Sequence, residues 1–478
     1  MPRGVADEAG PTRADALASR ERILAAAQAL RGDRRASMTE LAAAAGVGRS
    51  TLYRHFPTRE ALAAALERHE TDPLPAGAPV PSGSGVMALP PRAPGRLGAG
   101  PLRLEVTHVL DEVPPHLIAD QLVAEARRAA GVAVALYVVD IDGSQLVRLA
   151  GSDDFPARLK APPALGPEIV PEGLPAFYER LRRRLPQCAV APLWLRGRVI
   201  GLLLSVGTPL TSLEDIAKHG AAALELADDY TDLIEAARRR KPTTAAAEVQ
   251  HHLLPPRIAR VTGAQVAGGL LPSYEVAGDW FDYVENRDGA WIAIAEAVGG
   301  GPTAAGFSAS ALGALKAVRR AGGDLAEAAR AMDEVVRALG DAAFHITAVL
   351  ARWHAPTATL RWINCGHPQG WIVDPDDAMA PLAGPEHPPL GMAGAPAAWT
   401  ATTTRLESGD RLLLVTNGVL EREVTGGGVF GADGVRAAVE QAGAPTAAAT
   451  ALAIQQAVAR AWTEPLADDA TLLVLAVD

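Results

Sequence analysis

The sequence has only two cysteines, no long apolar run and no leader-like N-terminus. Cys188 and Cys365 stand far apart without a CxxC pair, so neither a disulfide framework nor a zinc site is expected. The longest strongly apolar run, residues 199–206, is far shorter than the roughly 18 residues that span a membrane. The N-terminus lacks the charged-then-apolar pattern of a signal peptide. These absences predict a cytoplasmic protein.

Aromatic residues are also scarce, at 4% of 478 residues, whereas 49% of the residues are hydrophobic and many of those are alanine. Such a composition favours helix-rich cores, and the length predicts about three domains. The net charge of −10 is unevenly spread, because residues 11–70 hold ten Lys/Arg against seven Asp/Glu. This asymmetry fits a small nucleic-acid module on an acidic body.

Residues 13–71 have the pattern of a helix-turn-helix. Apolar residues recur at helical spacing over 19–30, and Gly46 ends a second, short helix. A third helix follows, in which Leu52 and Phe56 are expected to face inward. Its polar residues can reach phosphates and base edges. These candidate DNA-binding residues are Arg49, Ser50, Thr51, Tyr53, Arg54 and His55.

The stretch MTELAAAAGVGRSTLYRHFPTREAL closely resembles the DNA-binding head of TetR-type regulators. The resemblance implies that DNA is a partner. The helical ligand-binding and dimerising domain of TetR regulators does not follow here. Because paired half-sites supply much of the affinity of such heads, we expect the chain to act as a homodimer.

Residues 72–100 are dominated by Pro, Gly, Ala and Ser and are interpreted as a flexible linker. Residues 101–210 then show a helix over 118–130 and two hairpins over 132–150 and 188–206. This order of elements resembles a GAF-type sensor domain of the α/β class. No feature of the sequence identifies its ligand.

Residues 211–254 are predicted to be a connecting helical segment. One long helix is expected over 212–240 and, after Pro242, another over 245–254. The apolar residues expected to cluster on the long helix are Ile216, Ala223, Leu224, Leu226 and Leu233. The segment fits a dimer seam, a transmission lever or a helix packed on its own domain.

Residues 255–478 alternate strands and helices, which predicts a layered α/β sandwich. Three stretches place acidic or amide side chains beside predicted strand ends: 273–283 (SYEVAGDWFDY), 415–421 (VTNGVLE) and 467–474 (ADDATLLV). Carboxylates that meet from distant segments are how hard divalent cations are usually held. We therefore expect a metal site there.

The order of motifs resembles the SpoIIE-type branch of the PPM family of metal-dependent serine/threonine phosphatases. The matching landmarks are residues 249–256, 276–282, 363–368, 389–391, 416–421, 430–431 and 468–473. The resemblance implies two Mn²⁺ or Mg²⁺ ions that activate a water for attack on phosphorus. It implies as metal ligands Asp279, Glu296, the backbone carbonyl of Ala297, Asn417 and Asp468, with Asp279 and Asp468 as the catalytic residues.

Two of these positions depart from the family pattern, which has Asp where this chain has Glu296 and Asn417. Glu moves the bridging oxygens by about an ångström, and Asn loses a unit of negative charge that such sites depend on. We expect Asp282 to cap local backbone and Asp469 to lie on the opposite face from Asp468. The pattern predicts lowered metal affinity, and hence either a slow phosphatase or a folded, metal-poor pseudophosphatase.

The sequence thus suggests a regulatory, metal-dependent protein serine/threonine phosphatase of low activity, combined with a sensor and a DNA-binding head. The resemblance implies as substrate a phosphorylated regulatory protein, such as an anti-sigma-factor antagonist. The alternative is a transcriptional regulator whose C-terminal domain, 255–478, is a non-catalytic binding or dimerisation module. His367 is expected to fix a loop rather than to act as an acid, and the glycines of 426–431 to form a flexible loop rather than a nucleotide site.

Overall fold

The computed structural model describes residues 22–23, 26–27, 41, 44–47, 52, 56, 62, 113–271, 278–339, 344–392, 398–461, 466 and 468–478. Contacts divide the chain into two compact units, Met1–Ala99 and Gly100–Asp478. In the first unit the described apolar side chains form one small core: Ile23, Ala27, Leu41, Ala45, Leu52, Phe56 and Leu62. The inward positions of Leu52 and Phe56 are confirmed. The six candidate DNA-binding residues and the linker 72–100 lie outside the described residues.

The middle region, residues 113–240, is built on a seven-stranded sheet. Its strands run in the order β3-β2-β1-β7-β5-β4, and β6 pairs with β7. The strands are β1 (Ala133–Val139), β2 (Gln145–Ala150), β3 (Arg158–Lys160), β4 (Ala164–Leu165), β5 (Glu168–Ile169), β6 (Cys188–Leu195) and β7 (Arg198–Val206). The helices are α6 (Ile118–Ala130), α7 (Leu174–Arg184), α8 (Glu214–Asp228) and α9 (Leu233–Arg238). Both predicted hairpins are present.

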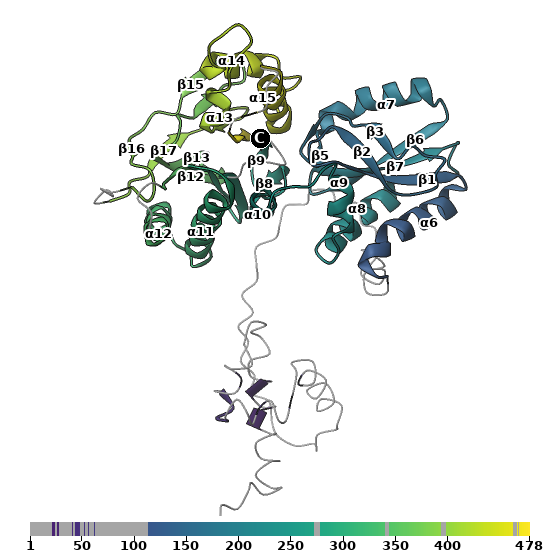
Figure 1. The fold of residues 1–478 in the computed structure, drawn as a ribbon, viewed down its shortest axis with the longest axis horizontal. Coiled ribbons are helices and arrows are strands. Elements are labelled where there is room, and N and C mark those ends of the chain that lie inside the picture. The colour runs from purple at the N-terminus through teal and green to yellow at the C-terminus, as the bar shows by residue number, and fades with distance from the viewer. Residues whose placement is uncertain are drawn as a thin grey trace, which may run out of the picture. The chain divides into compact units, whose positions relative to one another are not determined.

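The helices of the middle region divide between the two faces of its sheet (Figure 1). Alternate residues of β1 explain this division: Leu136 packs in one core with α6 and α8, while Tyr137 packs in the other with α7. Each face of the strand is apolar, so both faces need a cover. This sheet therefore has a helix layer on each side.

The prediction of one long helix over residues 212–240 is wrong. The chain turns between α8 and α9, where Thr231 Oγ1 accepts a hydrogen bond from the backbone N of Leu233, 3.3 Å away. Acidic residues at 228 and 229 oppose the negative end of a helix dipole, which favours a break there. Leu226 and Leu233 are exposed rather than clustered, whereas Leu224 packs α8 on its own sheet.

The C-terminal region holds two six-stranded sheets, in the orders β10-β11-β12-β13-β16, with β17 on β13, and β15-β14-β18-β19-β9-β8. The strands are β8 (Ile258–Val261), β9 (Ala264–Leu271), β10 (Asp279–Asn286), β11 (Gly289–Ala297), β12 (Ile346–His354), β13 (Thr359–Cys365), β14 (Trp371–Val373), β15 (Met379–Pro381), β16 (Glu386–His387), β17 (Thr402–Arg405), β18 (Arg411–Val415) and β19 (Ala470–Val477). The helices are α10 (Ala245–Leu253), α11 (Gly301–Arg320), α12 (Leu325–Ala338), α13 (Asn417–Leu420), α14 (Gly431–Glu440) and α15 (Ala447–Ala461).

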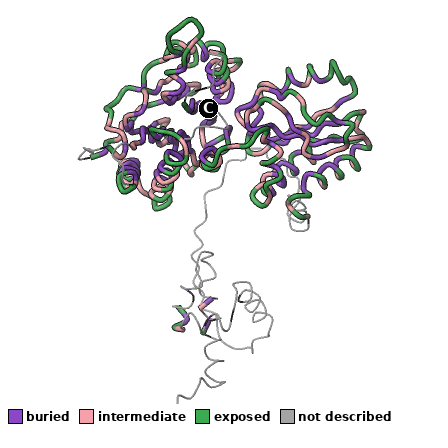
Figure 2. The backbone as a smooth tube through the Cα atoms, in the orientation of Figure 1, coloured by how far each residue is buried: buried purple, intermediate pink, exposed green. Residues whose placement is uncertain are grey.

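The two sheets pack face to face and the helices cover their outer faces, so the predicted sandwich is confirmed (Figure 1). Phe281 and Ile294 of the first sheet meet Leu414 and Leu473 of the second in a buried central core. Helices α11 and α12 cover the first sheet, and α14 and α15 cover the second. The buried segments in Figure 2 follow these strands. The polar ends of the strands are thereby held at the margin of the sandwich.

In the described residues no helix is long and apolar enough to cross a membrane.

Candidate functional site

Asp279 and Glu296 face each other at the end of the antiparallel pair β10–β11. Both are buried, at 1% and 8% exposure. The end of β18 in the other sheet reaches them: Thr416 Oγ1 donates to Asp279 Oδ2 at 2.7 Å, and the backbone N of Asn417 donates to Glu296 Oε2 at 3.1 Å. The structure thus brings three of the expected site residues to one place. Residues 273–277 of the first stretch lie outside the described residues.

The two aspartates before β19 have different surroundings. Asp468 is exposed, and its charge is among the causes that raise the pKa of Glu296. Asp469 is buried and turns the other way: its Oδ2 accepts hydrogen bonds from the backbone N of Gly278 at 2.9 Å and of Asp279 at 3.2 Å. Asp469 therefore positions Asp279 through the backbone.

Three residues support this site although the sequence had given them no role. Gln250 of α10 donates from Nε2 to Asp469 Oδ2 at 2.6 Å and to the Asp279 carbonyl at 2.9 Å. Ser308 of α11 donates to the Gly278 carbonyl at 2.6 Å, and Thr416 holds Asp279 itself. Gln250 and Thr416 stood inside matched motifs, so a signal existed; Ser308 had none.

Asp282 does not cap local backbone, as had been expected. Its carboxylate pairs with two cations of α11, at 2.5 Å from Arg319 Nη1 and 3.7 Å from Lys316 Nζ. Asp282 faces the helix layer because it lies three residues beyond Asp279 on the alternating strand β10. It anchors α11 to the first sheet and cannot compensate for a lost ligand.

The pKa values of the buried acidic side chains at the site are raised. Burial, followed by the charges of Asp469 and Glu296, raises the pKa of Asp279 well above its ordinary value. Burial also raises the pKa of Glu296, against the hydrogen bond from the Asn417 backbone, and raises the pKa of Asp469 to about 6. Such repulsion between buried carboxylates is relieved by a proton or by a cation.

A divalent cation fits these residues only in part. A Cβ at Gly278 would lie 2.6 Å from the carbonyl oxygen of Ala297, so only glycine leaves that oxygen clear beside Asp279. Two carboxylates and this carbonyl suit one hard cation. Asn417 instead interacts with the Glu296 carboxylate: its backbone N donates to Glu296 Oε2, and its side chain acts against the rise of the Glu296 pKa that burial causes.

A second cation does not fit. Within the described ranges no group of three His, Cys, Asp or Glu side chains is arranged to hold a metal ion. Since Asn417 is neutral, the charge that two divalent ions require is missing. The complete two-metal site implied by the resemblance is therefore not reproduced by these residues.

His367 is buried in the loop after β13. Its Nδ1 lies 3.0 Å from Thr347 Oγ1, and Asn364 accepts from its backbone N at 2.7 Å. Burial lowers the pKa of His367 to about 3, so the ring is neutral near pH 7. These contacts agree with a loop-fixing residue.

The motifs, set on a two-sheet α/β sandwich, are those of a phosphatase domain of the PPM type. The family model described as Stage II sporulation protein E (SpoIIE) matches residues 286–478, and the model for bacterial regulatory proteins of the tetR family matches residues 23–66. The chain therefore joins a TetR-type N-terminal domain to a SpoIIE-type phosphatase domain.

Proteins of known function and solved structures include several that are similar to this chain. Phosphoserine phosphatase RsbU of Bacillus subtilis is 23% identical over 230 residues, covering 48% of this chain and 68% of that protein. The SiaA-PP2C domain of Pseudomonas aeruginosa is 20% identical, with a TM-score of 0.42 and coverage of 54% of this chain and 99% of that one. The PP2C phosphatase domain and regulatory fragment of SpoIIE from Bacillus subtilis is 12% identical, with a TM-score of 0.39 and coverage of 65% and 77%.

Proposed function

We propose that this chain is a DNA-binding regulator whose SpoIIE-type domain is a metal-dependent protein serine/threonine phosphatase of low activity. The observation that carries the proposal is the meeting of Asp279, Glu296 and Asn417 at the ends of strands from both sheets. A cation would be held by Asp279, Glu296 and the Ala297 carbonyl, and Asp468, whose charge acts on Glu296, would join them as a ligand on binding. When bound, Mn²⁺ or Mg²⁺ would acidify a water for attack on a phosphoryl group.

The other residues of the site position the expected metal ligands. Asp469 and Gln250 fix the backbone that carries Asp279, and Thr416 fixes its carboxylate. The side chain of Asn417 interacts with the Glu296 carboxylate, which weakens that residue as a metal ligand. Weak metal binding is the physical reason for the low activity that we propose.

The proposal assigns a substrate class and a role to each other part. The substrate is a phosphoserine or phosphothreonine on a regulatory protein, such as an anti-sigma-factor antagonist. The proposed domains are a DNA-binding head (13–71), a linker (72–100), a GAF-like sensor (101–210), a connecting segment (211–254) and the phosphatase domain (255–478). The helix layers on both faces of the middle sheet support the GAF-like assignment. Action as a homodimer on DNA is part of the proposal.

Phosphate release from a phosphoserine peptide, with millimolar Mn²⁺ or with EDTA, tests the enzymatic role. We expect slow, Mn²⁺-dependent release that Asp279→Ala abolishes and Asn417→Asp increases. Asp288→Ala is the matched control, because Asp288 lies at the far end of the β10–β11 hairpin near Arg352. If neither the wild type nor Asn417→Asp turns over, the domain is not an enzyme.

The second candidate is a non-catalytic binding or dimerisation module, favoured by the neutral Asn417, whose backbone N donates to Glu296 Oε2. DNA binding is common to both candidates and is tested by a mobility shift at increasing salt. We expect Arg54→Ala to weaken binding and to reduce its salt dependence. Binding that neither salt nor this variant changes would contradict a role of the head in DNA contact.

A further inference from the structure

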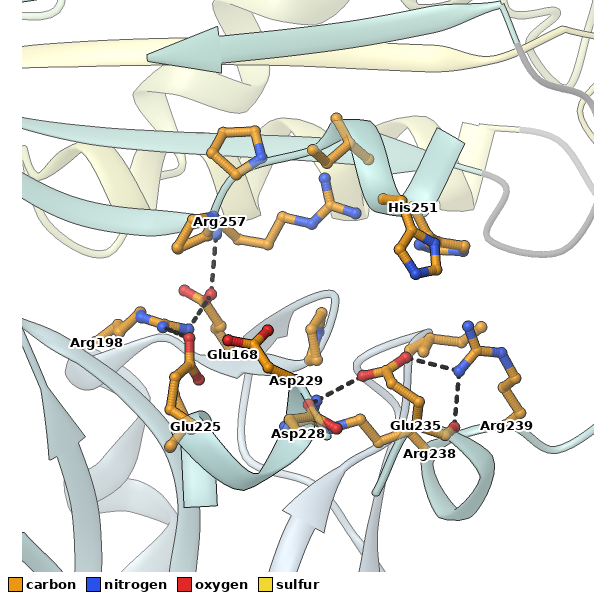
Figure 3. Close-up of a pocket in the computed structure, with 17 residues that line it drawn as sticks. Glu168, Arg198, Glu225, Asp228, Asp229, Glu235, Arg238, Arg239, His251 and Arg257 are labelled. Atoms are coloured by element: carbon orange, nitrogen blue, oxygen red, sulfur yellow. Dashed lines mark hydrogen bonds and ion pairs between the residues drawn. The ribbon is translucent and has the colours of Figure 1, made fainter. Parts of the chain in front are cut away.

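A cavity of about 340 Å³ lies in the second unit where the middle region meets the start of the C-terminal region (Figure 3). Its walls are the β5–β7 edge of the middle sheet, α8, α9, α10 and the chain entering β8. This volume is at the lower end of the range for small-molecule sites. The cavity inside the middle region, between Tyr137 and Phe177, measures about 10 Å³ and holds one water at most.

Four arginines line the cavity, and three of them are paired with carboxylates. Arg198 Nη1 lies 2.9 Å from Glu168, Arg238 Nη1 lies 2.7 Å from Glu235, and Arg239 Nη1 lies 2.6 Å from Glu235. These pairs satisfy charges that burial would otherwise make costly. They line the cavity as ion pairs.

Arg257 is the exception. Its side chain is 7% exposed, its Nη1 is buried without a hydrogen-bond partner, and its guanidinium lies 5.4 Å above the ring of Phe281. Glu168 meets the backbone N of Arg257, at 3.0 Å, rather than its guanidinium. Figure 3 shows the Arg257 side chain running along the cavity toward His251. Burial lowers the pKa of Arg257 to about 10.

A buried guanidinium offers five donors and is costly to leave without an acceptor. Its planar fork suits the two oxygens of a carboxylate or phosphate. On the opposite wall, Oδ1 of Asp228 is also buried without a partner. The cavity lining therefore presents two buried donors without a partner, Nη1 of Arg257 and Nε of the otherwise paired Arg238, and one buried acceptor without a partner, Oδ1 of Asp228.

We propose that this cavity binds a small molecule whose carboxylate or phosphate pairs with Arg257 and whose hydroxyl or ammonium group donates to Asp228. The inference deepens the sensor role and rests on it for its biological meaning. Helix α10 carries His251 at the cavity and Gln250 at the carboxylate site, so the ligand would lie beside a helix that contacts Asp279. Ligand binding can be measured without any phosphatase or DNA-binding assay. Failure of the ligand site can therefore be distinguished from failure of the proposed function.

Thermal unfolding of the full chain with inorganic phosphate or with malonate, at constant ionic strength, tests the site. We expect one of the anions to raise the Tm saturably, by about 2 °C at a tenfold excess over its Kd. Arg257→Met should abolish this shift without lowering the Tm of the ligand-free protein, because it removes a buried unpaired charge. Arg260→Met is the matched control, since Arg260 is an exposed arginine beside Asp478, and it should respond as the wild type.

A response to phosphate alone assigns a phosphorylated ligand, and a response to malonate alone assigns a carboxylate. The proposal is overturned if neither anion exceeds sodium chloride, or if Arg257→Met keeps the shift. It is also overturned if Arg257→Met lowers the ligand-free Tm by several degrees, because Arg257 is then structural. Should Arg257→Met not fold, Arg257→Lys decides: a reduced shift supports the site and an unchanged shift contradicts it.

Discussion

The carboxylate site and the cavity at the region boundary are both buried and charged, but they are neutralised differently. At the carboxylate site burial, followed by the charges of neighbouring carboxylates, raises the pKa values of Asp279, Glu296 and Asp469. At the cavity wall, acidic and basic groups pair within hydrogen-bonding distance, as Glu168 does with Arg198. Paired charges stabilise a structure, whereas unpaired like charges persist where a proton or cation is to be bound.

The largest expected effect comes from breaking the ion pair between Glu168 and Arg198 at the cavity wall. Glu168→Gln leaves Arg198 without its most buried partner and weakens two bonds to the backbone of β8 and its entry, so we expect a loss of about 3–5 kcal/mol in unfolding free energy. Urea denaturation measures it. Glu225→Gln, which alters the more exposed partner of Arg198, should cost less than about 1 kcal/mol. Equal losses in the two variants would show that the buried ion pair stabilises the fold no more than the exposed one.

The next effect concerns the supports of the carboxylate site. Gln250→Ala removes a donor from buried Asp469 and should cost about 1–3 kcal/mol in urea denaturation. Gln121→Ala, which removes a part-buried hydrogen bond to Glu125 within helix α6, is the control and should lower the unfolding free energy by a few tenths of the loss caused by Gln250→Ala. A stability unchanged by Gln250→Ala would mean that α10 does not hold the site.

Asn417→Asp sharpens the comparison by adding one more like charge to the carboxylate site. We expect a lower Tm in EDTA and an affinity for Mn²⁺ raised about tenfold, or ~1.4 kcal/mol. Isothermal titration with Mn²⁺ measures the affinity. Asn286→Asp, at the far end of β10, should leave it unchanged. An equal gain in both variants would indicate a general charge effect.

The smallest effects are opposite pH dependences. Because the pKa of Asp279 is raised in the folded state, its contribution to stability is full below its ordinary value of 3.8 and is lost as the pH rises through the folded value. Burial acts to raise the pKa of Glu235 too, but Arg238 and Arg239 outweigh it and lower that pKa; its contribution is present above 4.5 and lost as the pH falls through the folded value.

The Tm measured in EDTA from pH 3 to pH 8 separates these two dependences. Asp279→Asn should remove part of the loss of stability on raising the pH, and Glu235→Gln part of the loss on lowering it. The same sign in both variants would contradict the comparison between the two regions.

Much of the fold could be predicted because hydrophobic periodicity and turn residues are local. The helix over 118–130 and the hairpin over 188–206 were predicted where the structure has them. The helix over 212–240 was not, since its break depends on acidic residues that helical spacing alone does not weigh. Strand β10 was not predicted either: its first four residues, 279–282, are all buried, so that half of the strand does not alternate between polar and apolar residues.

For the site, motif order predicted Asp279, Glu296 and Asn417, which the structure brings together. It could not predict that Asp282 turns to α11 or that Gln250 reaches Asp469, because both contacts join segments far apart in the chain. The cavity was not foreseen at all, since its lining comes from several separate elements.

The sequence by itself determined the parts: a TetR-type head, a SpoIIE-type domain and a neutral Asn417 where a charged ligand is expected. These are properties of residue identity and order. Only the tertiary structure decided which charges are satisfied, that is, that Arg198 is paired and Arg257 is not. The reason is that the partner of a buried charge is set by the packing of distant segments, which local sequence does not encode.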